Sequence, residues 1–164
     1  MEKSIEAQVG ELLRRHGLTL ALGESCTGGL LGDRITNVPG SSDYFRGGVV
    51  AYSNQAKERL LGVRQVTLQD QGAVSKETAL EMARGARTVL GADIAVAVTG
   101  IAGPGGALPG KPVGLTWVAL CGPNKEWAGE FTWEGERLSN KRQSAEAALQ
   151  ILLDYLKGLA ARGG

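Results

Sequence analysis

The 164-residue sequence is poor in the residues on which metal sites and disulfide scaffolds depend. It contains one histidine, His16, and two cysteines, Cys26 and Cys121. A multi-histidine metal site within one chain is excluded, and two cysteines cannot build an all-cysteine zinc site. Two cysteines also form no disulfide framework, so we expect a protein of the reducing cytoplasm.

A charge excess and a long apolar run are also missing. Eighteen basic residues stand against 17 acidic ones, and the net charge of +1 argues against direct binding to nucleic acid. No apolar run approaches the roughly 20 residues of a membrane span, and residues 1–6 have no apolar signal region. We therefore expect neither nucleic acid nor membrane as a partner. The length predicts a single domain over residues 1–164.

Glycine, in contrast, is abundant. The chain has 25 glycines in 164 residues, about twice the average usage of ~7%. They follow no period and cluster where apolar runs end, as at residues 28–29, 47–48 and 100–110. Glycines at such places suggest backbone that comes close to a ligand.

Helical and strand patterns alternate along the chain. Helical spacing predicts helices that end near Gly17, Asn37, Gly62 and Leu90, and a long last helix over residues 138–159. Strands are predicted over residues 18–22, 47–52 and 94–98, followed by a hairpin of residues 113–121 and 126–133. This order predicts an α/β fold, a three-layer α/β/α sandwich with a mixed, mostly parallel sheet.

Several patterns predict which side chains are buried. Residues 94–98 are continuously apolar, as in a strand buried on both faces, whereas residues 18–22 alternate. Val89 is expected on the core face of its helix, and Leu138 at the start of the buried stripe of the last helix. The last strand has three aromatic residues on one face, either as an open patch for self-association or under the last helix: Trp127, Phe131 and Trp133.

The first candidate site is residues 24–29, Glu-Ser-Cys-Thr-Gly-Gly, at the end of a predicted strand and the start of a helix. Ligands of α/β sheets favour this location, and the free N–H groups of a helix start bind phosphate or an oxyanion. Ser25 fits two roles, nucleophile and simple N-cap, and Thr27 also fits a cap. Cys26 is a rival nucleophile if the helix start lowers its pKa, and otherwise an inert structural thiol.

The second candidate is residues 52–57, Tyr-Ser-Asn-Gln-Ala-Lys, at another strand-to-helix corner. With Ser53 or Asn54 as N-cap, Lys57 falls near the positive end of the helix dipole, which disfavours its charged form. Partial burial acts in the same direction and favours a general base. The alternatives are a solvated surface lysine, and for Tyr52 a core ring.

The third candidate is the loop after the buried strand, residues 99–106, which contains Gly100 and Gly103. It fits a backbone cradle for phosphate or ribose and equally a bare turn. His16 is far in sequence from every glycine cluster, so a serine nucleophile would take its base from a lysine. Three arginines are candidate phosphate clamps: Arg46, Arg137 and Arg142.

Together these segments resemble the CinA C-terminal domain family. The resemblance lies in residues 24–29 and 52–57, in Gly-Ala-Val-Ser at 72–75, in Thr-Gly-Ile-Ala-Gly-Pro at 99–104, and in Lys-Pro-Val-Gly at 111–114. These motifs occur in order over nearly the whole chain.

The resemblance implies an amidohydrolase that deamidates nicotinamide mononucleotide to nicotinic acid mononucleotide and ammonia, with no metal and no cofactor. It implies Ser25 as nucleophile, Lys57 as base, and Tyr52 and Thr99 as their support. Arg142 is implied as a contact to the substrate or its phosphate. Further substrate contacts are expected from the glycine-rich segments, at Thr27, Gly28, Gly29, Gly100 and Gly103.

Two other classes of function stay open. One is a non-catalytic module that binds a nucleotide or a competence-related partner. The other is a hydrolase of a different amide on the same scaffold. We also expect the chain to form homo-oligomers.

Overall fold

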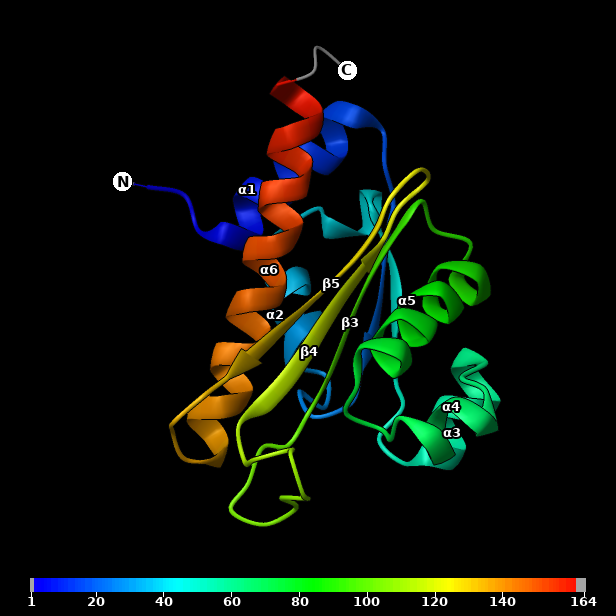
Figure 1. Cartoon of the computed structure of the whole chain (residues 1–164). Coiled ribbons are helices and arrows are strands. Elements are labelled where there is room, and N and C mark those ends of the chain that lie inside the picture. Colours follow the sequence, from blue (N-terminus) through cyan, green and yellow to red (C-terminus); the bar gives the residue numbers. More distant parts are fainter. Residues whose placement is uncertain (1, 162–164) are drawn as a thin grey trace.

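The computed structural model describes residues 2–161 and alternates helices with strands (Figure 1). Its elements in chain order are α1 (Ile5–His16), β1 (Leu20–Glu24), α2 (Leu30–Thr36), a 3-10 turn (Ser41–Asp43), β2 (Phe45–Val50), α3 (Asn54–Leu61), α4 (Gln65–Asp70), α5 (Lys76–Leu90), β3 (Ile94–Gly100), β4 (Leu115–Cys121), β5 (Glu126–Thr132) and α6 (Arg137–Ala161). No helix within residues 2–161 combines the length and apolar character of a membrane span.

The five strands form one mixed sheet in the order β2-β1-β3-β4-β5. β1 pairs in parallel with both β2 and β3, while β4 is antiparallel to β3 and to β5. Only β4 therefore runs against the other four, which confirms the predicted mixed sheet. The carboxyl ends of β1, β2 and β3 share one edge, so the segments that follow them in the chain are brought together there.

Helices cover both faces of the sheet, which completes the three layers (Figure 1). The face under α1, α2 and α6 carries large side chains such as Leu22 and Val96, and the face under α5 carries small ones such as Ala21 and Ala97. Small residues let α5 pack close to the sheet. Gly85 of α5 extends this close packing to α3, because a Cβ there would lie 1.8 Å from the carbonyl oxygen of Leu61.

Two of the expected core positions are wrong. Val89 and Leu138 are 61% and 63% exposed. On α5 it is Leu90, not Val89, that packs against the sheet side, and Leu138 precedes Asn140, the first buried residue of α6. β1 starts at Leu20 and is buried at all five positions, so the alternating pattern predicted over residues 18–22 is also wrong. α4 has no counterpart among the predicted elements.

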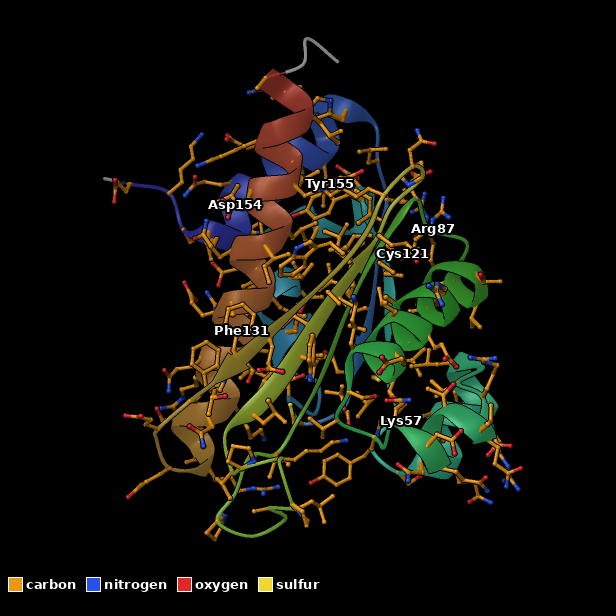
Figure 2. All side chains as sticks on the ribbon, in the orientation of Figure 1. Lys57, Arg87, Cys121, Phe131, Asp154 and Tyr155 are labelled. Atoms are coloured by element: carbon orange, nitrogen blue, oxygen red, sulfur yellow. The ribbon has the colours of Figure 1, made fainter. Side chains whose placement is uncertain are left out.

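Two of the three aromatic residues, Phe131 and Trp133, lie under the last helix, the second of the two alternatives, whereas Trp127 is 38% exposed. The Phe131 and Trp133 rings stack with centroids 5.2 Å apart, and Trp133 Nε1 donates to Ser144 Oγ of α6 at 2.9 Å. Figure 2 shows Phe131 between β5 and α6. These two rings therefore give no open patch for self-association.

Candidate active site

Ser25 stands on a sharp turn directly after β1. Its N–H donates to the Val98 carbonyl of β3 at 3.0 Å, and the N–H of Gly28 donates back to the Ser25 carbonyl at 3.1 Å. Gly28 and Gly29 have φ of +60° and +106°, values that favour glycine. We call residues 24–29 the elbow. It holds Ser25 at the carboxyl edge of the sheet, with 6% of its surface exposed.

The carboxylate of Glu24 organises the elbow from inside. One oxygen accepts hydrogen bonds from Thr27 Oγ1 at 2.7 Å, from Gly29 N–H at 3.2 Å and from Leu31 N–H at 2.9 Å. The other accepts from Gly32 N–H at 3.0 Å. The N-cap of α2 is Gly29, so neither Ser25 nor Thr27 is the cap that the sequence allowed. The N–H groups of Gly29, Leu31 and Gly32 at the start of α2 therefore donate to Glu24 and do not bind an external anion.

Lys57 reaches Ser25 from the start of α3. Ser53 caps this helix by accepting from Ala56 N–H at 3.0 Å, as one of the two predictions had it. Lys57 is only 2% exposed, and its Nζ donates to Ser25 Oγ at 2.9 Å and to the Tyr52 carbonyl at 3.0 Å. In Figure 2 Lys57 lies at the end of the sheet away from Asp154 and Tyr155 of α6.

The surroundings of Lys57 favour its neutral form. Burial lowers the pKa of the amine, and within residues 2–161 no carboxylate forms an ion pair with it. Burial has the opposite effect on Cys26, where it raises the thiol pKa to about 11. A thiol with this pKa is protonated near neutral pH. The geometry therefore favours Ser25 over Cys26 as the nucleophile activated by Lys57.

Tyr52 contributes its backbone carbonyl to Lys57 and directs its hydroxyl elsewhere. The hydroxyl accepts from Arg137 Nη2 at 3.0 Å, and Arg137 Nη1 donates to the Gly103 carbonyl at 2.7 Å. Arg137 thus joins the start of α6 to two of the predicted segments. The Ser25–Lys57 contact is direct, with no hydrogen bond from the Tyr52 hydroxyl to either side chain.

Thr99 and Gly100 form the wall contributed by β3. Thr99 is 1% exposed and its Oγ1 donates to the Ala73 carbonyl at 2.8 Å, which fixes the segment before α5 against the sheet. A Cβ at Gly100 would lie 2.7 Å from Thr116 Oγ1 and 3.1 Å from Cys26 Sγ. Gly100 is thus needed for close packing behind the elbow.

A cavity of about 160 Å³ brings five of the ten predicted site residues together. Ser25, Tyr52, Lys57, Thr99 and Gly100 line it, with Arg137 at its edge. A larger hollow of about 600 Å³ adjoins it, because the two share Ala102 and Arg137, and Gly103 lines this second space.

The remaining predicted residues lie outside the cavity lining. Thr27, Gly28 and Gly29 belong to the elbow, and Arg142 lines a separate depression with Leu30 and Arg34. Sequence reasoning named Arg137 among the candidate clamps but did not carry it forward. It missed the role of Glu24, for which the available signal was a carboxylate directly before a glycine-rich turn. No three His, Cys, Asp or Glu side chains of residues 2–161 cluster as a metal site requires.

Comparison with known proteins agrees with the motifs. The family model for the CinA C-terminal domain matches residues 2–156. A CinA-like protein of Chlorobaculum tepidum is 52% identical over 161 residues, and one of Chloroherpeton thalassium is 48% identical over 156. These matches cover 95% and 93% of this chain but 38% and 37% of the relatives, so the chain spans little more than a third of their length.

Solved structures give the same result. The competence damage-inducible protein A of Klebsiella pneumoniae matches with a TM-score of 0.91 at 33% identity, covering 93% of this chain and 95% of that one. The competence/damage inducible protein CihA of Agrobacterium tumefaciens matches with a TM-score of 0.88 at 39% identity, covering 96% and 98%. The chain therefore belongs to the CinA C-terminal domain family.

Proposed function

We propose that this chain is an amidohydrolase that converts nicotinamide mononucleotide and water to nicotinic acid mononucleotide and ammonia. The observation that carries the proposal is the buried Lys57 amine, 2.9 Å from Ser25 Oγ and without a carboxylate partner within residues 2–161. A serine nucleophile without a neighbouring histidine needs another general base, and a buried lysine with a lowered pKa can supply it.

The first step is acylation of Ser25. Neutral Lys57 accepts the hydroxyl proton while Oγ attacks the carboxamide carbon, and a tetrahedral oxyanion forms. The C–N bond then breaks, and the proton held by Lys57 goes to the departing ammonia. The pyridinium charge of the substrate withdraws electrons from the carboxamide, which makes its carbon a better electrophile.

Two backbone N–H groups of the elbow are suited to the oxyanion. Within residues 2–161 those of Cys26 and Thr27 donate to no backbone carbonyl, whereas that of Gly28 is bonded to the Ser25 carbonyl. They directly follow the nucleophile in the chain. One preorganised donor of this kind is worth about 3–4 kcal/mol of transition-state stabilisation.

In deacylation water is the nucleophile and Ser25 Oγ is the leaving group. Water gives a proton to Lys57 as it attacks the acyl carbon, and the ester bond to Oγ breaks. Lys57 returns the proton to Oγ, and the product acid gives its remaining proton to solvent and leaves as the carboxylate. The hydrogen bond to the Tyr52 carbonyl, at 3.0 Å, keeps Nζ beside Oγ through both halves of the cycle.

The decisive test is ammonia release from nicotinamide mononucleotide by the purified chain, with and without EDTA. Turnover that EDTA leaves unchanged and Ser25→Ala abolishes is the expected result. Binding without turnover would overturn the proposal in favour of a non-catalytic nucleotide-binding module. Turnover of other amides only would keep the chemistry and change the substrate, and loss of activity in EDTA would refute the serine–lysine scheme.

A further inference from the structure

The first two turns of α6 carry three basic residues, and the helix sends them in different directions. Arg137 and Lys141 are four residues apart and so share one face, which points to the active site, while Arg142 lies about 100° further round. Arg142 faces the depression beside α2. The charge nearest the elbow on the second turn is therefore that of Lys141.

Lys141 lies directly against the elbow. Its Nζ is 3.9 Å from the position that a Cβ would take at Gly28. Gly28 lies in the same tight turn as the nucleophile, since its N–H donates to the Ser25 carbonyl at 3.1 Å. The charge of Lys141 also acts on the Cys26 thiol, where it opposes the rise in pKa that burial causes. The cation thus stands beside the elbow.

Lys141 has no acceptor of its own. The side chain is half-buried, yet within residues 2–161 it makes no hydrogen bond and no ion pair. Arg137 differs, because the Gly103 carbonyl and the Tyr52 hydroxyl already orient it. The start of α2 offers no alternative for an anion, because Glu24 occupies its N–H groups.

We infer that Lys141 binds the phosphate of the mononucleotide substrate over Gly28, beside the elbow. The inference rests on the proposed function and names the part of the substrate that this edge of the site recognises. A phosphate monoester offers three acceptor oxygens to the three N–H donors of a lysine. Gly28 suits this place because the absence of a side chain leaves the backbone open below the phosphate.

The test compares nicotinamide mononucleotide with nicotinamide riboside, which lacks the phosphate. Lys141→Gln is expected to raise KM for the mononucleotide about 10–100-fold with little change in kcat. The preference for mononucleotide over riboside, as a ratio of kcat/KM values, should fall by the same factor. Lys141→Arg should restore most of it. Lys157→Gln makes the same change on an exposed turn of α6 and should leave the ratio unaltered.

An equal loss on both substrates, or an unchanged ratio, would overturn the inference while leaving the amidohydrolase proposal intact. A second measurement tests the phosphate contact of Lys141 even if the chain does not hydrolyse nicotinamide mononucleotide. Calorimetric titration with ribose 5-phosphate needs no turnover, and Lys141→Gln is expected to weaken its binding about tenfold relative to Lys157→Gln. Equal binding by both variants, or none by the parent protein at millimolar ligand, would overturn the inference whatever the chain hydrolyses.

Discussion

Lys57 Nζ and Ser25 Oγ lie 2.9 Å apart across 32 residues of sequence. The contact follows from the pairing of β1 with β2. Ser25 comes directly after β1, Lys57 lies on the helix after β2, and parallel pairing sets the two carboxyl ends side by side. The dyad is thus a product of sheet topology, and the buried amine depends on the serine and one carbonyl for its hydrogen bonds.

Replacing either member of the dyad should remove turnover. Lys57→Met keeps the length of the side chain and removes the base, so we expect kcat to fall about 10²–10⁴-fold. Ser25→Ala should abolish covalent catalysis, and the double variant should be no worse than Ser25→Ala alone, because the two groups act as a unit. Steady-state ammonia release measures all three variants.

Cys26→Ala is the matched control for the dyad. It changes the neighbouring side chain in the same cavity and should retain activity near that of the parent protein, because the thiol pKa of about 11 leaves it protonated. Activity that survives Ser25→Ala and disappears in Cys26→Ala would transfer the nucleophilic role to the thiol.

The lowered pKa of Lys57 predicts how activity depends on pH. The base works when neutral, so kcat/KM should rise with pH and level off at an apparent pKa below the ordinary lysine value of 10.5. A kcat/KM profile measured over pH 6–11 tests this. A profile that still rises at the ordinary lysine value would exclude Lys57 as the base.

The same shift acts on stability. Between the folded and the unfolded pKa of Lys57 the unfolded chain binds the extra proton, so stability should increase with pH across that window. Below the window the folded protein must hold a buried charge. Lys57→Met should therefore gain stability relative to the parent protein at lower pH, and the gain should shrink as pH rises through the window. Urea unfolding at a series of pH values measures the difference.

Glu24 should be important for the stability of the elbow. Glu24→Gln replaces one carboxylate oxygen by an NH₂ group, which cannot accept from the backbone N–H groups that now point at it. Hydrogen bonds to charged groups contribute about 1.5–3 kcal/mol each, so we expect the free energy of unfolding to fall by about 2–3 kcal/mol. Urea unfolding checks this, with Glu58→Gln on the exposed side of α3 as control. Equal midpoints for the two variants would show that the Glu24 charge is not needed.

Sequence reasoning succeeded where one residue type has one local role. Gly17, Ser53 and Gly62 end or cap the helices as predicted, and the apolar run at residues 94–98 is a buried strand. Positions set by tertiary packing were less predictable. Val89 and Leu90 are neighbours on α5, and the rotation of the helix about its axis turns Leu90 to the sheet side and leaves Val89 exposed, which no local pattern encodes.

The candidate site divides in the same way. Ser25 and Lys57 could be named because each occupies a strand-to-helix corner, and corners of parallel strands meet. The partner of the Tyr52 hydroxyl could not be named, because Arg137 approaches from a helix 85 residues away in sequence. Similarly, the choice among Arg137, Lys141 and Arg142 depends on the rotation of α6 about its axis. That rotation is set by packing against the sheet and α1.

Arg137 and Arg142 should differ in their effect on activity. Arg137 links the Gly103 carbonyl to the Tyr52 hydroxyl at the edge of the cavity, so Arg137→Ala frees the loop and the ring together. We expect kcat/KM to fall about tenfold or more, with poor rescue by lysine, whose single ammonium lacks the planar fork that spans two acceptors.

Arg142→Ala changes an exposed side chain in a separate depression and should lower kcat/KM much less. Kinetics on nicotinamide mononucleotide, with thermal melts to show that both variants fold, compare the two arginines directly. A greater loss for Arg142→Ala would mean that the substrate extends toward α2 rather than into the hollow between residues 102–104 and the start of α6.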